Sequence, residues 1–164
     1  MCDTNIYQKI LLSYNSVIHL PARFSKGRMQ MTNHDLALLI PSRPASIADD
    51  FFKFHRRHGS VFWWSRSRIA RSLEVPITGY IYQGGRIRYR LKVAEILNKA
   101  PEWAESAVPE EYRARLRSEL EEAHSFLKIV AFERLEHTLS LNDFVTGKEL
   151  RRAPRRTIYV LRKT

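Results

Sequence analysis

The chain has 164 residues, which is enough for one domain with a hydrophobic core of its own. Hydrophobic residues make up 44% and charged residues 27%, a balance that excludes disorder as the dominant state. A single cysteine, Cys2, excludes an internal disulfide framework and a cysteine-based zinc site. No apolar run has the length of a membrane span and no signal peptide is evident, so we expect a cytoplasmic protein without a membrane partner.

The balance of charge is the first feature that points to a partner. Basic residues number 28 and acidic residues 17, which gives a net charge of +11. Of the cations 20 are arginine, the side chain that forks onto phosphates and stacks on bases. A thermophilic surface rich in ion pairs would carry more charges of both signs, so it does not explain an excess of one sign. The composition therefore favours a polyanionic partner.

The charges are also separated along the chain. Between Lys53 and Lys92 there are ten cations and one acid, whereas the segment from Glu102 to Glu136 carries nine acids. A second basic cluster lies around Pro154 and consists of Arg151, Arg152, Arg155 and Arg156. This separation predicts one basic working face and a solvated acidic back.

The first part of the chain is expected to contain a strand, a loop and a short helix. Residues 9–20 are rich in Ile, Leu, Val and Tyr and predict a strand, and residues 23–30 form a basic loop. Thr32 and Asp35 resemble a capping pair that opens a short helix through Ile40, stopped by the proline that follows.

A second helix is predicted over residues 47–58. Ser46 and Asp49 have the spacing of a capping pair at its start. Gly59 is a suitable C-terminal cap, because glycine adopts the left-handed conformation at little cost. A short aromatic strand is predicted to follow over residues 61–65.

The clearest hairpin lies in the middle of the chain. Residues 77–83 and 86–96 predict two strands joined by the two-residue turn Gly84-Gly85. Glutamates and helically spaced leucines predict a third helix over residues 109–124. Further strands are predicted over residues 126–139 and 157–162. This succession indicates an α+β fold, a small curled β-sheet or barrel with two to three peripheral helices, as one domain over residues 1–164.

The strand that begins at Arg86 carries the strongest single signal. Strict alternation would place Ile87, Tyr89, Leu91 and Val93 on one face and Arg86, Arg88, Arg90 and Lys92 on the other. Side chains on one face of a strand are about 6.6 to 6.8 Å apart, close to the spacing of phosphates along a nucleic-acid strand. The alternative is an edge strand protected from aggregation, for which one or two charges suffice. We therefore expect nucleic-acid backbone contacts from Arg66, Arg68, Arg86, Arg88, Arg90 and Lys92.

The aromatic run at Trp63 and Trp64 is the second signal. Neighbouring side chains on a strand face opposite ways, so we expect one indole in the core and the other in a cavity, where it could stack on a base. Tyr80 and Tyr82 share a face of the next strand and could form the opposite wall. The predicted base pocket is therefore Trp63, Trp64, Ser65, Tyr80 and Tyr82. The alternative is that every ring belongs to the core.

The sequence gives little support for catalysis. Gly147-Lys148 lacks the upstream glycine of a phosphate-binding loop. His55 and His58 are one helical turn apart and could bind a metal, although two arginines lie between them. We expect no catalytic residue, no metal and no cofactor. Two alternatives stay open: a small ribonuclease that uses His55, His58 or His137, and a protein-interaction domain that docks through its glutamate-rich helix.

Two segments of the chain resemble a known superfamily. The stretches Gly59 to Ser65 (GSVFWWS) and Tyr89 to Ile96 (YRLKVAEI) resemble the PUA-like superfamily, and more narrowly its EVE and YTH branches. The resemblance implies a small curled sheet that holds a pocket for a modified base. The residues to which it assigns a place in this pocket are Trp63, Trp64 and Ser65. The closest functional analogy is the N-terminal DNA-binding specificity domain of McrB-type, modification-dependent restriction proteins.

This resemblance implies a function. We expect binding of DNA with a modified base flipped into the aromatic pocket, and the alternative of an RNA-binding module stays open. By the same analogy, the partners would be an AAA+ motor domain in the same chain and a separate nuclease. The 164 residues would then be the N-terminal part of a longer protein.

Overall fold

The computed structural model describes residues 36–44, 46–70, 73–146 and 152–163. The strand predicted over residues 9–20 and the loop over residues 23–30 lie outside these ranges. In chain order the main elements are β1 (Leu36–Pro41), α2 (Ser46–His58), β2 (Val61–Ser65), β3 (Ile77–Gln83), β4 (Arg86–Leu97), α3 (Arg113–Glu119), β5 (Ser125–Leu139), β6 (Phe144–Val145) and β7 (Ile158–Arg162). Three short 3-10 turns cover Glu105–Ala107, Glu110–Tyr112 and Leu141–Asp143.

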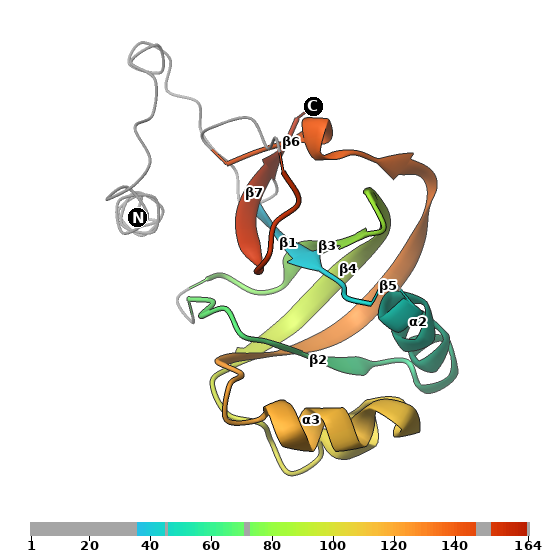
Figure 1. Ribbon diagram of the computed structural model, residues 1–164, viewed down its shortest axis with the longest axis vertical. Coiled ribbons are helices and arrows are strands. Elements are labelled where there is room, and N and C mark those ends of the chain that lie inside the picture. The colour runs from blue at the N-terminus through green and yellow to red at the C-terminus, as the bar shows by residue number, and fades with distance from the viewer. Residues whose placement is uncertain (1–35, 45, 71–72, 147–151, 164) are drawn as a thin grey trace.

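The described strands form one seven-stranded sheet in the order β2-β5-β4-β3-β1-β7-β6 (Figure 1). Strand β1 is parallel to β3, and every other pairing is antiparallel. The α+β class is therefore confirmed. The barrel alternative is wrong, because the edge strands β2 and β6 of this sheet do not pair with each other.

Strand β1 corrects the first helix prediction. Residues Leu36–Pro41 form a strand between β3 and β7, where a helix through Ile40 was expected. Leu38 and Ile40 enter the main core, while Leu39 enters a second hydrophobic cluster on the other face of the sheet. A strand covered on both faces has a continuous apolar run rather than an alternating one, and such a run does not distinguish strand from helix.

Helix α2 ends at the predicted residue and begins one residue before the predicted start. It spans Ser46–His58, and Gly59 follows it with a φ of 78°, the left-handed conformation expected of a glycine cap. Its Asp49 carboxylate accepts hydrogen bonds from the Tyr89 hydroxyl and from Nε2 of Gln83, the latter at 2.9 Å. These contacts fasten α2 to the β3–β4 hairpin. Of the helices in the described ranges, none is long and apolar enough to cross a membrane.

The β3–β4 hairpin is confirmed, and its turn explains both glycines. Gly84 and Gly85 have φ values of 56° and 85°, which only glycine adopts without strain. Beyond the turn the register shifts: Tyr82 pairs with Ile87, but Ile81 pairs with Tyr89. Arg88 is the extra residue of a β-bulge.

The bulge overturns the predicted single row of four cations. Ile87 lies in the second cluster, whereas Tyr89, Leu91 and Val93 lie in the main core, so the two halves of β4 are out of phase. Arg86 pairs with Gln83, whose side chain reaches α2. Only Arg90 and Lys92 retain the expected alternation on the face opposite the main core.

The predicted helix over residues 109–124 is shorter in the structure. A 3-10 turn precedes α3, and α3 ends at Glu119. The chain leaves the helix because the backbone N–H of His124 donates to the carbonyl of Ser65 at 2.9 Å, and β5 begins at the next residue. The early end of α3 brings its last turn against β2 (Figure 1).

Candidate nucleic-acid groove

A groove lies where the sheet fails to close. It has a volume of about 1020 Å³. Its walls come from the end of β1, the first half of α2, the end of β2, the following segment 66–68, the α3 region and the segment 155–158 that leads into β7. The groove therefore lies on the open side of the curled sheet, between β2 and the β1–β7 pair.

Polar side-chain contacts join the two walls of this groove. The hydroxyls of Ser65 and Thr157 lie 3.0 Å apart, and both residues are buried. Five residues further on, the backbone N–H of Ala70 donates to the Tyr159 hydroxyl at 2.8 Å. The segments 65–70 and 157–159 therefore run side by side, although about ninety residues separate them in sequence.

The two tryptophans of β2 have different environments. Trp63 is 7% exposed and packs edge-on against Phe51 of α2, with ring centroids 4.9 Å apart. Trp64 is half-buried, and its Nε1 donates a 2.7 Å hydrogen bond to Oε2 of Glu119 on α3. Its ring also lies near Phe51, with centroids 6.0 Å apart, and Trp64 lines the groove. Trp63 is a core residue, and Trp64 is the accessible indole.

Tyr80 and Tyr82 do not form the opposite wall of the groove. Both belong to the second hydrophobic cluster, where the Tyr80 ring lies edge-on to Phe144 with centroids 5.0 Å apart. The Tyr80 hydroxyl accepts a 3.4 Å hydrogen bond from Arg162. Alternation along β3 places Tyr80 on the face opposite its neighbour Ile81, which points into the main core. The predicted pocket therefore retains Trp63, Trp64 and Ser65 and loses both tyrosines.

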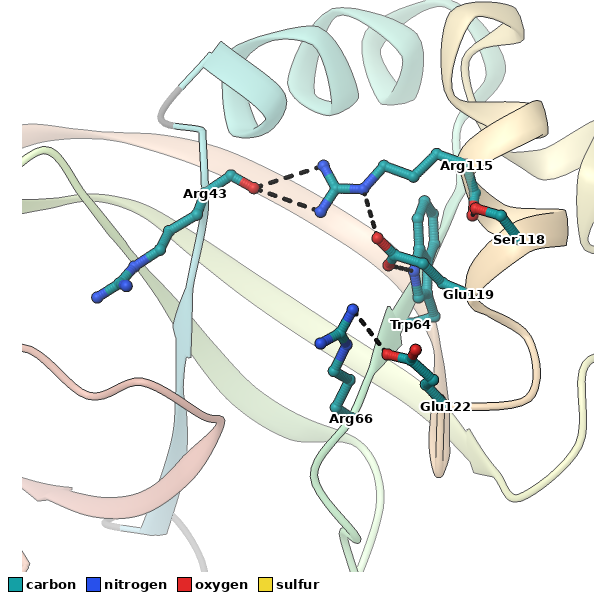
Figure 2. Close-up of polar contacts among 7 residues, drawn as sticks. All are labelled: Arg43, Trp64, Arg66, Arg115, Ser118, Glu119 and Glu122. Carbon is teal, nitrogen blue, oxygen red and sulfur yellow. Dashed lines mark hydrogen bonds and ion pairs between the residues drawn. The ribbon is translucent and has the colours of Figure 1, made fainter.

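Arginine dominates the charge of the groove. The six arginines in its lining are Arg43, Arg66, Arg68, Arg115, Arg155 and Arg156, against two glutamates, Glu119 and Glu122. Arg66 pairs with Glu122 and Arg115 with Glu119, each at 2.8 Å (Figure 2). None of the ion pairs among the described residues involves the other four arginines, and all four are exposed. A concave surface lined by one sign of charge concentrates anions.

Glu119 organises one side of the groove. Burial alone would raise its pKa, but hydrogen bonds from Trp64 and Arg115 and the positive charges of Arg115 and Arg66 outweigh burial, so the pKa of this carboxyl is lowered. Glu119 is therefore an ionised acceptor at neutral pH. The guanidinium of Arg115 also reaches the Arg43 carbonyl at 3.4 and 3.5 Å. Figure 2 shows the resulting chain of contacts from the β1–α2 loop through α3 to β2.

The cations of β4 lie away from the groove. Arg90 forms an ion pair with Glu133 of β5 at 2.6 Å, and this partner raises the pKa of the guanidinium. Arg90 and Lys92 pair across the strand with Tyr80 and Thr78, on the sheet face opposite the main core. The edge-protection alternative does not hold, because β4 lies inside the sheet. The structure thus separates the predicted backbone set: Arg66 and Arg68 line the groove, and the four β4 cations do not.

Four arginines of the groove were not among the predicted site residues: Arg43, Arg115, Arg155 and Arg156. The basic cluster around Pro154 was the one signal that could have found two of them. Placing this cluster at the groove requires knowledge of the contact between Ser65 and Thr157, which no local sequence pattern predicts.

His55 and His58 remain on α2, outside the groove lining. The His58 ring lies 4.2 Å from that of Phe54, and both ring nitrogens of His55 are buried without a hydrogen-bond partner among the described residues. Within these residues there is no cluster of three or more His, Cys, Asp or Glu side chains that could hold a metal ion.

Comparison with known proteins finds no protein-family model and no curated protein that matches this chain.

Proposed function

We propose that the groove binds nucleic acid, with one nucleotide held out of its stack against Trp64. The observation that carries this proposal is the combination of one accessible indole with six arginines around a groove of about 1020 Å³. Ligand pockets usually measure about 300 to 1000 Å³. The groove therefore has room for a nucleotide together with its flanking phosphates.

The two kinds of side chain have different tasks in this proposal. A base stacked on an aromatic ring gains about 1 to 3 kcal/mol, whatever its identity, because every base has a π-face. The arginines supply planar forks that match phosphate oxygens and hold the backbone. Trp64 thus takes the base, and Arg68, Arg155 and Arg156, which form no ion pair with another described residue, take the phosphates that follow it.

DNA with a modified base is the ligand that we propose for this groove. Flipping a base out of a duplex costs a few kcal/mol, which stacking and hydrogen bonds to the base edge can recover. The resemblance of residues 59–65 and 89–96 to EVE and YTH domains supports this choice and a PUA-like origin of the fold. By the same resemblance we propose a role as the specificity domain of a modification-dependent restriction system.

Fluorescence anisotropy on short labelled oligonucleotides tests the function. The panel contains unmodified duplex, duplexes with N6-methyladenine, 5-methylcytosine or 5-hydroxymethylcytosine, and matched single-stranded DNA and RNA, each over a salt series. We expect one modified duplex to bind at least tenfold more tightly than the unmodified one at every salt, a difference of about 1.4 kcal/mol.

Other outcomes would redirect or overturn the proposal. Equal binding of all duplexes with a steep salt dependence would show backbone binding without recognition of a modified base. Preference for RNA would assign the groove to an RNA-binding module. Absence of binding to every oligonucleotide at low salt would overturn nucleic-acid binding altogether.

A further inference from the structure

The two arginine–glutamate pairs in the groove differ in how firmly they are held. The Glu119 side chain is 20% exposed, and besides Arg115 it accepts the Trp64 indole N–H. The Arg66 and Glu122 side chains are 61% and 60% exposed, and within the described ranges neither has a hydrogen bond or ion pair other than the one they share. The fold therefore holds the Arg115–Glu119 pair in place, whereas the Arg66–Glu122 pair is exposed to solvent.

An exposed ion pair is easily exchanged. Both of its groups keep most of their hydration, so their mutual attraction is weak. A backbone phosphodiester carries one negative charge, as a carboxylate does, and it forms charge-assisted, bidentate contacts with arginine. A phosphate that reaches Arg66 can therefore replace the carboxylate of Glu122.

Arg66 also lies on the path that a bound strand would follow. It comes two residues after Trp64 and one after Ser65, whose hydroxyl touches Thr157. The same contact brings Arg155 and Arg156, which precede Thr157, toward the Arg66–Arg68 segment. A backbone that runs from the base at Trp64 toward Arg68, Arg155 and Arg156 thus passes Arg66.

We propose that Arg66 is a phosphate subsite and that Glu122 occupies it in the free protein as a substitute anion. This inference rests on the proposed function of the groove. Binding exchanges the Glu122 carboxylate for a backbone phosphate, so Glu122 lowers the affinity for every polyanion whose phosphate takes its place at Arg66. Glu122 then acts as an internal competitor for this subsite.

The test compares Glu122→Gln with Glu121→Gln. Both glutamates are exposed neighbours, and both substitutions remove one negative charge, but Glu121 does not line the groove and has no ion pair among the described residues. Affinity for the tightest-binding oligonucleotide of the panel is measured by anisotropy at 0.15 M salt, where charges farther apart than about 8 Å are largely screened. We expect Glu122→Gln to bind roughly two- to fivefold more tightly than Glu121→Gln.

A double-mutant cycle with Arg66→Ala completes the test. If Glu122 acts through Arg66, the advantage of Glu122→Gln over Glu121→Gln disappears when Arg66 is alanine. Arg66→Ala alone should lower the slope of log affinity against log salt by about one phosphate contact. Thermal unfolding of each variant checks that the fold is unchanged.

The failures of the inference and of the function are distinguishable. Equal affinities of Glu122→Gln and Glu121→Gln, or weaker binding by Glu122→Gln, overturn the inference while leaving the groove as a binding site. An advantage that persists with alanine at position 66 also overturns it. Absence of oligonucleotide binding by the unsubstituted protein overturns the proposed function and the subsite with it.

Discussion

The indole of Trp64 and the carboxylate of Glu119 are joined by a 2.7 Å hydrogen bond between Nε1 and Oε2. This bond fixes the edge of the indole on α3 and leaves part of its ring open to the groove. Since Glu119 also holds Arg115, one carboxylate positions both an aromatic surface and a cation. The pairing gives the proposed binding site a defined geometry before any ligand arrives.

Trp64→Ala is expected to weaken the binding of the preferred oligonucleotide by about 1 to 3 kcal/mol, because the stacking surface is lost. Trp64→Phe keeps an aromatic face and should retain most of the affinity. Trp103→Ala is the matched control, since this indole is 40% exposed and lies outside the groove lining. Anisotropy titrations measure all three, and an equal loss in Trp64→Ala and Trp103→Ala would contradict the assignment.

Trp63→Ala should act on stability instead. This indole is 7% exposed and packs against Phe51, so its removal leaves a cavity in the core. Large-to-small changes of this kind cost about 3 to 5 kcal/mol. Chemical denaturation should therefore show a much lower midpoint for Trp63→Ala than for Trp64→Ala. A fully stable Trp63→Ala that has lost binding would reverse the roles of the two tryptophans.

The separation of the basic residues predicts unequal effects on salt dependence. Arg68→Ala should weaken every oligonucleotide alike and lower the slope of log affinity against log salt by about one, because one phosphate contact is lost. Lys92→Ala should leave the slope unchanged, since Lys92 lies on the sheet face opposite the main core. A lower slope in Lys92→Ala would show that the backbone also follows β4.

Alkaline pH should destabilise the protein through Tyr89. Burial, the hydrogen bond to Asp49 and the negative charge of Asp49 raise the pKa of Tyr89 to about 12. An unfolded tyrosine loses its proton near pH 10, so the unfolded state binds fewer protons than the folded state between pH 10 and 12. The contribution of Tyr89 to the free energy of unfolding is therefore fully present below pH 10, and it is lost as the pH rises toward 12.

Tyr89→Phe should make this fall shallower, and urea denaturation at several pH values measures it. Part of the fall will remain, because burial and Asp50 also raise the pKa of Tyr112 to about 12. Tyr112→Phe should remove a separate part. An unchanged pH profile in Tyr89→Phe would contradict the link between Tyr89 ionisation and unfolding.

Local patterns predicted the elements whose signals are local. The start of α2 at Ser46, the glycine cap at Gly59 and the Gly84-Gly85 turn all depend on residues within a few positions, and the structure contains each of them. The prediction for β1 was wrong because its apolar run reflects neighbours on both faces of the sheet, and these neighbours are distant in sequence. The bulge at Arg88 was not predicted, because no glycine lies at this position to indicate it.

The candidate site divides in the same way. The aromatic run and the arginines after it are contiguous, so Trp64, Arg66 and Arg68 could be found in the sequence. The prediction for Tyr80 and Tyr82 was wrong because the sequence of β3 does not show which of its two faces turns toward the groove. That depends on the neighbouring strands, which are distant in sequence. Arg115 and Arg156 reach the groove only through the early end of α3 and the contact of Thr157 with Ser65.

That contact has a mechanical consequence. The walls of the groove are joined by the hydroxyl pair of Ser65 and Thr157 and by the bond from Ala70 to Tyr159, rather than by a strand ladder. Each such bond contributes only about 0.5 to 1.5 kcal/mol. The width of the groove is therefore a compliant dimension of the molecule: no pairing among the described strands directly joins the two walls, so a change in width acts on these side-chain bonds and on the packing of Ile69 and Tyr159 in and against the main core.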